Sequence, residues 1–97
     1  MLTHVVFFKF NPRTSDTDVQ HVEEALLALP AAISEIREFR VGRDIVRSDR
    51  SYDLALVSGF EDLEAMQRYQ VHPEHQKVVA YIKTIASSII AVDFLEE

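Results

Sequence analysis

Tyr69 and His75 are the side chains best suited to acid–base chemistry, and they lie on either side of a break in a helical pattern. A histidine near its ordinary pKa can act as a general base and take a proton from an acidic carbon between two carbonyl groups. A tyrosine hydroxyl can donate a hydrogen bond to the enolate oxygen that then forms. In a purely structural interpretation, Tyr69 joins Leu63 and Met66 in a core stripe while His75 caps the restarted helix. The sequence favours the structural interpretation and leaves the catalytic one open.

Two other histidines also have the chemistry for a site. Alternate side chains of a strand share a face, so His4 lies beside Val6 and Phe8 on an apolar face. His4 is therefore either a hydrogen-bonded core residue or the polar anchor for a carbonyl ligand in a cavity walled by Val6 and Phe8. His72 is expected at the N-cap of a helix. As a metal pair with His75 it lacks an evident third ligand, so we predict no metal site.

Composition restricts the class of protein. Ninety-seven residues suit one domain, residues 1–97. The net charge is −6 and no basic patch is visible, which argues against nucleic acid or an anionic membrane surface as a partner. The absence of cysteine excludes disulfides, thiolate catalysis and zinc–thiolate sites. No apolar run could span a bilayer and the chain enters a strand at once, so we expect a cytoplasmic protein.

The hydrophobic periodicity predicts alternating strands and helices. Pro30 is expected to stop the first helix, and Gly42 to mark a bulge or bend in the second strand. The expected elements are a strand at 3–10, a helix at 16–29, strands at 36–46 and 52–60, a helix that opens at 61–62 and is broken at 72–73, and a strand at 88–95. This β-α-β-β-α-β order predicts an α+β, ferredoxin-like fold, with helices on one face of a four-stranded antiparallel sheet.

The first and last strands, at 3–10 and 88–95, are apolar on both faces, and a single helix layer can cover only one. We do not expect these two strands to pair with each other. The helix-free face would expose a larger apolar patch than soluble monomers usually carry. Two copies packed bare face to bare face would bury roughly 800 Å² per partner in an isologous homodimer. Asp53 and Asp93, carboxylates on otherwise apolar strands, are each expected to lie at the surface or the interface and to pair with an arginine such as Arg40 or Arg43.

Several segments resemble the stress-responsive A/B barrel domain family: THVVFFKF at 3–10, the SYD and ALV of the third strand, VHPEHQ at 71–76 and VDF at 92–94. The resemblance implies a homodimeric α+β barrel. An enzymatic relative, olivetolic acid cyclase, closes a linear poly-β-keto thioester by an intramolecular aldol condensation without a cofactor. By this resemblance, the catalytic histidine and tyrosine fall on His75 and Tyr69, and the strand histidine of the family falls on His4. Many relatives carry a histidine where this chain has Leu54, so one polar group of the pocket is missing.

Three functions remain open, and we expect no cofactor for them. The first is a dimer that binds a small apolar or carbonyl ligand in a pocket between sheet and helices, lined by His4, Val6, Phe8 and Leu54. The second is a cofactor-independent, polyketide-cyclase-like lyase, and the third is an assembly protein with a solid barrel. A cavity of roughly 300 Å³ or more that contains His4, Tyr69 and His75 would favour the first two functions, and a filled core would favour the third.

Overall fold

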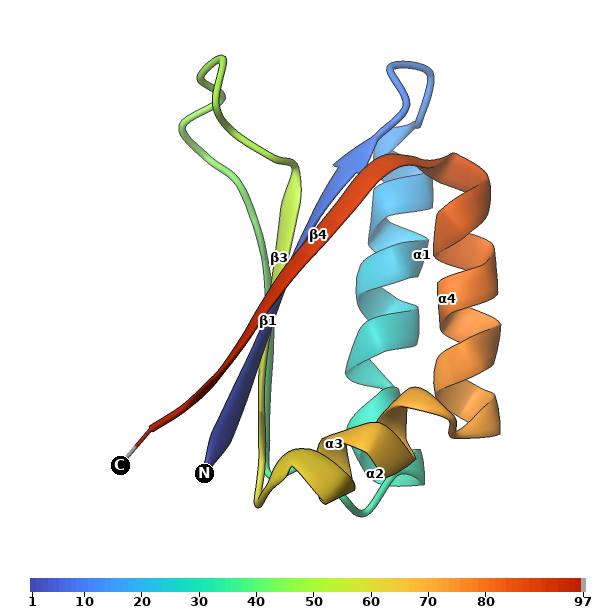
Figure 1. Ribbon diagram of the computed structural model, residues 1–97. Coiled ribbons are helices and arrows are strands. Elements are labelled where there is room, and N and C mark those ends of the chain that lie inside the picture. Colours follow the sequence, from blue (N-terminus) through green and yellow to red (C-terminus); the bar gives the residue numbers. More distant parts are fainter. Residues whose placement is uncertain (97) are drawn as a thin grey trace.

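The computed structural model describes residues 1–96, which form one sheet with helices on one side (Figure 1). The order of elements confirms the predicted β-α-β-β-α-β pattern, with each helical segment divided in two. The elements are β1 (Leu2–Phe10), α1 (Asp16–Leu27), α2 (Leu29–Ala32), β2 (Glu38–Arg43), β3 (Leu54–Phe60), α3 (Leu63–Gln70), α4 (Pro73–Ile85) and β4 (Ala86–Leu95). Within residues 1–96, none of the helices has the length and apolar character that a bilayer crossing requires.

The sheet is antiparallel throughout and has the strand order β2-β3-β1-β4. β1 is therefore a central strand. The expectation that the first and last strands do not pair is wrong, because β4 pairs along the whole length of β1 and places Asp93 opposite His4. The register of this ladder shifts between Lys9 and Phe10. The pairing of β1 with β4 decides which groups meet across the sheet at the candidate site.

β2 and β3 are shorter than the expected strands at 36–46 and 52–60. Gly42 pairs regularly with Ala55 and has open space where a side chain would stand, so the expected bulge at this glycine is absent. The carboxylate of Asp53 accepts hydrogen bonds from the backbone N–H of Phe10 at 2.8 Å and from the guanidinium of Arg47 at 2.7 Å. The backbone of Asp53 also hydrogen-bonds on both sides: its N–H donates to the carbonyl of Phe8 at 2.9 Å, and its carbonyl accepts from the N–H of Asp44 at 3.0 Å. β3 itself begins one residue later, at Leu54.

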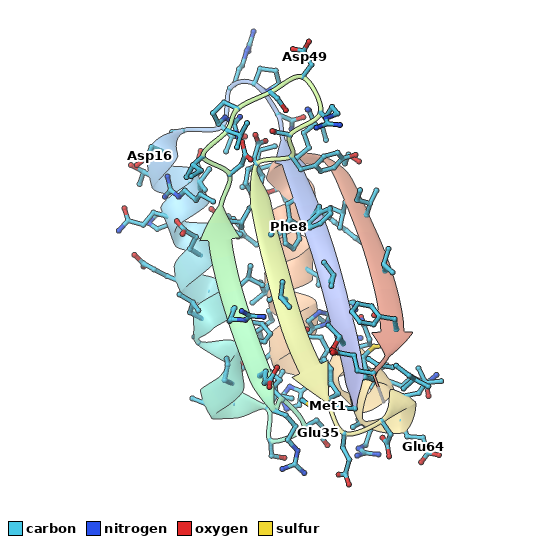
Figure 2. All side chains as sticks on the ribbon, turned by 90° about the vertical axis from the view of Figure 1, so that its left-hand side faces the viewer. Met1, Phe8, Asp16, Glu35, Asp49 and Glu64 are labelled. Atoms are coloured by element: carbon cyan, nitrogen blue, oxygen red, sulfur yellow. The ribbon has the colours of Figure 1, made fainter. Side chains whose placement is uncertain are left out.

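The helices cover only one of the two faces of β1. The covered face carries the even-numbered side chains from Leu2 to Phe10, all of them buried, as the alternation predicts. Val22 and Leu26 lie four residues apart on one side of α1 and complete the core below the sheet. Figure 2 looks onto the opposite face of the sheet, where no helix lies in front of the strands.

The first helical segment ends earlier than expected. α1 begins at a capping box, in which the side chains of Ser15 and Asp18 each accept a hydrogen bond from the other's backbone N–H. It ends at Leu27 rather than at residue 29, and Pro30 lies in the first turn of α2. Proline is tolerated there because the first N–H groups of a helix have no acceptor within the helix.

The predicted helix break at His72-Pro73 is confirmed. His72 is the N-cap of α4, and its Nδ1 accepts a hydrogen bond from the backbone N–H of Glu74 at 3.1 Å. Pro73 occupies the first helical position, where its fixed backbone angle suits the helix. The turn between α3 and α4 brings Tyr69, near the end of α3, against His75, in the first turn of α4.

Candidate functional site

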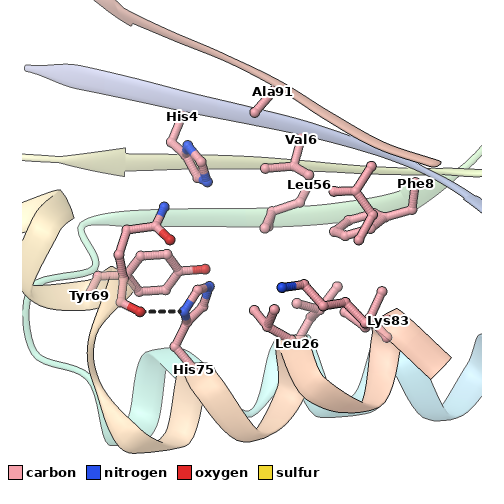
Figure 3. Close-up of a pocket in the computed structure, with 13 residues that line it drawn as sticks. His4, Val6, Phe8, Leu26, Leu56, Tyr69, His75, Lys83 and Ala91 are labelled. Carbon is pink, nitrogen blue, oxygen red and sulfur yellow. Dashed lines mark hydrogen bonds between the residues drawn. The ribbon is translucent and has the colours of Figure 1, made fainter. Parts of the chain in front are cut away.

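A cavity of about 260 Å³ lies between the covered face of the sheet and α4 (Figure 3). Its walls are mostly apolar and include Val6 and Phe8 of β1, Leu56 of β3 and Ile82 of α4. The polar side chains that line it come from three elements: His4 on β1, Tyr69 and Gln70 on α3, and His75 and Lys83 on α4. The fold therefore gathers these residues from positions far apart in the sequence.

The ring of His75 is buried and held in one orientation. Its Nδ1 lies 3.1 Å from the backbone carbonyl oxygen of Gln70. A carbonyl oxygen can only accept a hydrogen bond, so Nδ1 carries the proton and Nε2 of the neutral ring keeps its lone pair. Burial lowers the pKa of His75; the Gln70 carbonyl opposes this shift, while the neighbouring rings of His4 and His72 add to it. His75 is therefore a neutral proton acceptor at pH 7.

The phenol of Tyr69 is fully buried, and its ring packs against Phe60 and His75 with centroid distances of 4.9 and 4.2 Å. Among residues 1–96 no group forms a hydrogen bond with its hydroxyl, although that oxygen is shielded from solvent. Burial raises the pKa of Tyr69, so the hydroxyl stays protonated at pH 7 and can donate. A hydrogen-bond acceptor brought into the cavity would satisfy it.

His4 faces the cavity from the sheet side (Figure 3). Its Nδ1 forms a hydrogen bond with the carboxylate of Asp93, the residue directly opposite on β4. The expected pairing of Asp93 with Arg40 or Arg43 is wrong, because both arginines lie on β2, at the other edge of the sheet from β4. His4 is a hydrogen-bonded core residue, and its ring also lines the cavity. The sequence leaves open whether His4 is a core residue or a polar group in the wall of a cavity.

Together, these rings place a lone pair on nitrogen, a hydroxyl donor and a second imidazole around one apolar space. The ring centroids of His4 and Tyr69 lie 6.3 Å apart. Such a constellation can accept a proton from a carbon acid at His75 and hold the resulting oxyanion at Tyr69. Residues 1–96 contain no group of three or more His, Asp or Glu side chains that could hold a metal ion.

Five of the six predicted site residues line this cavity: His4, Val6, Phe8, Tyr69 and His75. Leu54 does not line it. Leu54 is buried opposite Phe8 in the ladder of β1 and β3, and Leu56, two residues further along the same face, takes a place in the wall.

Three polar groups in or next to this cavity are not among the site residues predicted from the sequence. The partner of His75 is the backbone carbonyl of Gln70, which carries no side-chain signature. The partner of His4 is Asp93, and finding it requires the register of β4 on β1. Lys83 does have a signal, since it lies eight residues after His75 and therefore on the same face of a helix.

The fold and sequence match known proteins over nearly the whole chain. A family model described as Stress responsive A/B Barrel Domain matches residues 2–96. An uncharacterised protein of Streptomyces coelicolor is 32% identical over 93 residues, which are 94% of this chain and 96% of that protein. The dimeric ferredoxin-like protein of unknown function from Thermobifida fusca is 31% identical, with a TM-score of 0.87 over 96% of this chain and 88% of that one.

A further solved structure, the hydroxynitrile lyase from Passiflora edulis, has a TM-score of 0.89 at 16% identity and covers 99% of this chain and 93% of its own. At that identity the likeness shows the fold alone. These structures confirm the predicted ferredoxin-like α+β fold. From the family match over residues 2–96 and the 32% identity to the Streptomyces protein, the chain belongs to the stress responsive A/B barrel domain family.

Proposed function

We propose that this protein, as a homodimer, binds a small, mostly apolar ligand with a carbonyl or enol oxygen in the cavity between the sheet and α4. The observation that carries the proposal is the Tyr69 hydroxyl, which is buried beside the cavity and has no hydrogen-bond partner among residues 1–96. A buried polar group without a partner costs about 1–3 kcal/mol. A ligand oxygen that accepts from this hydroxyl would remove that cost.

The size and walls of the cavity are consistent with such a ligand. Its volume of about 260 Å³ is somewhat below the roughly 300 Å³ that we set as the expectation for a ligand site. An apolar cavity of about 150 Å³ nevertheless accepts benzene, so this space has room for one six-membered ring or a five-carbon diketone. His4 and His75 add polar groups on two sides of a mostly apolar wall, as in other small-molecule sites.

The test is a titration with 2,4-pentanedione, a small β-diketone, followed by two-dimensional ¹H–¹⁵N NMR. Shifts are expected to concentrate on β1, α3 and α4. Tyr69→Phe keeps the ring and removes the hydroxyl, so it should raise Kd about fivefold, the equivalent of one lost hydrogen bond. Tyr81→Phe removes the same group from α4 outside the cavity lining and should leave Kd unchanged.

Two results would contradict ligand binding at this site. One is binding that Tyr69→Phe weakens no more than Tyr81→Phe does. The other is the absence of binding to the unmodified protein, which would favour the third function, an assembly protein that takes no ligand.

The homodimer is supported by the open face of the sheet, which Figure 2 shows toward the viewer. Phe7 of β1 and Ile90, Val92 and Phe94 of β4 are between 41 and 64% exposed on this chain alone. Phe7 pairs with Ile90 in the ladder, so these side chains form one continuous patch, which we call the open-face patch. Soluble monomers rarely expose a patch of this kind. The relative from Thermobifida fusca, 31% identical, is dimeric.

A second function, cofactor-independent aldol chemistry, is favoured by the orientation of the His75 ring, which leaves Nε2 free. In this reaction Nε2 takes a proton from a CH₂ between two carbonyls, and the Tyr69 hydroxyl donates to the enolate oxygen. The enolate carbon forms a bond to a second carbonyl carbon of the same molecule, whose C=O electron pair moves onto its oxygen. The protonated His75 then returns the proton to that alkoxide.

His75→Asn tests this second function, because asparagine can still donate to the Gln70 carbonyl but is not a base. Turnover of a panel of β-diketone thioesters should fall about a hundredfold or more. His21→Ala, which removes an exposed histidine from α1, should leave turnover unchanged. Unchanged turnover in His75→Asn, or no turnover by the unmodified protein, would contradict the lyase function and leave the binding function intact.

A further inference from the structure

We propose that Lys83 makes the cavity selective for carboxylates, so that its ligand is a small, mostly apolar acid that also carries a carbonyl or hydroxyl oxygen. This inference rests on the proposed binding function and names the ligand class. The inference comes from the orientation and charge environment of Lys83.

The position of Lys83 follows from helix geometry. His75, Val79, Ile82 and Lys83 recur at helical spacing on α4, and all four line the cavity. Side chains of a helix lean toward its N-terminus, so Lys83 reaches back over Val79 toward His75. In Figure 3 the ammonium group of Lys83 accordingly points into the space between α4 and the sheet.

The charge environment leaves this ammonium free for a ligand. Neither Asp nor Glu is among the residues that line the cavity. No carboxylate within residues 1–96 forms an ion pair with Lys83. By contrast, Nζ of Lys77 on the same helix lies 3.4 Å from a carboxylate oxygen of Glu74. The carboxylate of Asp93, on the sheet side, already has His4 as its partner. Lys83 is thus the one side chain with a fixed positive charge that lines this cavity in the described part of the chain.

A role at the helix end does not account for this arrangement. A lysine in the last turn of a helix can complement the negative end of the helix dipole, and Lys83 is in the last turn of α4. Its side chain runs the other way, toward the start of the helix and into the cavity (Figure 3). No carbonyl oxygen of the described residues 1–96 accepts a hydrogen bond from Lys83, so its ammonium group is available to a carboxylate that enters the cavity.

The two polar positions define the ligand. Tyr69, inside the cavity, provides a donor for a carbonyl or hydroxyl oxygen, and Lys83, which is exposed to solvent at the edge of the cavity, provides a cation for a carboxylate. The wall between them is apolar and includes Val79 and Ile82. The volume of about 260 Å³ limits the connecting part of the ligand to one ring or a short chain.

The experiment compares salicylate with salicylamide, which has nearly the same shape and no charge, by isothermal titration calorimetry. Lys83→Met keeps the length of the side chain and removes its charge. An ion pair at a solvent-exposed site contributes up to about 1 kcal/mol, so Lys83→Met should raise Kd for salicylate by up to about fivefold. The Kd for salicylamide should change by less than about twofold, since it carries no charge. Lys77→Met, a matched change on the exposed side of α4, should alter neither value.

The outcomes separate this inference from the proposed function. The inference is overturned if Lys83→Met weakens the binding of both probes equally or of neither, or if the unmodified protein does not bind salicylate. In each of these cases the proposed function still stands if the protein binds salicylamide or 2,4-pentanedione. If none of the three probes binds, both the proposed function and this inference fail. Circular dichroism of Lys83→Met checks that the exposed substitution leaves the fold intact.

Discussion

At the scale of single residues, His75 connects the site to the pH dependence of stability. Burial lowers its pKa in the folded chain below the ordinary value of 6.5, so the unfolded chain binds the proton more readily. The free energy of unfolding should therefore be fully retained above about pH 6.5 and should fall as pH decreases from there toward the folded pKa. Urea unfolding on either side of pH 6.5 measures this slope.

Two variants show whether His75 causes the slope. His75→Asn should flatten the pH dependence in this window, because asparagine does not titrate. His21→Ala is the control, because it removes an exposed histidine of α1 that does not line the cavity. A slope that persists unchanged in His75→Asn would mean that another group is responsible.

The hydroxyl of Tyr69 gives a second prediction at this scale. Tyr69→Phe removes a buried group without a partner and keeps the ring contacts with Phe60 and His75. The free energy of unfolding should rise by about 1–3 kcal/mol, the cost of the buried hydroxyl, even though ligand binding weakens. A loss of more than about 1 kcal/mol in urea unfolding would show that the hydroxyl already has a partner in the free protein.

At the scale of elements, the turn between α3 and α4 positions the two reactive rings. His72 caps α4 through its Nδ1, so His72→Ala should cost about 1 kcal/mol of stability. His72→Asn supplies a side-chain oxygen for the same cap and should cost less. Hydrogen exchange of the backbone amides in the first turn of α4 would report this difference locally. Equal exchange rates in both variants would exclude a capping role.

The sequence predicts the elements better than their ends. Apolar runs and helical spacing indicate each strand and helix. Proline at position 73 indicates the break at His72-Pro73, because proline is favoured at the first position of a helix. The ends depend on contacts that periodicity does not contain. Asp53 binds the Phe10 backbone and the loop before β3, and Pro30 starts a new short helix instead of ending the previous one. The sequence also could not show that the strand is regular at Gly42, because a glycine can take part in an ordinary ladder pair without a bulge or bend.

At the scale of the whole molecule, the open-face patch makes the dimer a specific prediction. Val92→Lys places a positive charge in the patch of each copy, so a symmetric dimer would bury two such charges in its interface. Sedimentation at micromolar concentration should therefore show the 11.1 kDa monomer instead of a dimer. Val71→Lys is the matched control, because Val71 is 67% exposed and Val92 64%, but Val71 lies on the helix side. A monomeric unmodified protein, or a Val92→Lys dimer as stable as the control, would refute this interface.

Only part of the candidate site could be predicted from the sequence, because its residues are brought together by tertiary packing. Patterns within single elements identified His4, Val6 and Phe8 as one strand face, and the family resemblance implied Tyr69 and His75. The partner of His4 depends on strand register, and the volume of the cavity depends on the spacing between α4 and the sheet. Neither quantity is encoded in a local pattern, so Asp93 and the space itself emerge only from the fold.

The central claim is that the space beside Tyr69 receives a ligand oxygen, and a crystal structure of the protein soaked with 2,4-pentanedione tests it most directly. The account predicts the diketone in the cavity between the sheet and α4, with one oxygen within hydrogen-bond distance of the Tyr69 hydroxyl. A diketone found only elsewhere on the surface, or a cavity closed by its own side chains, would contradict it.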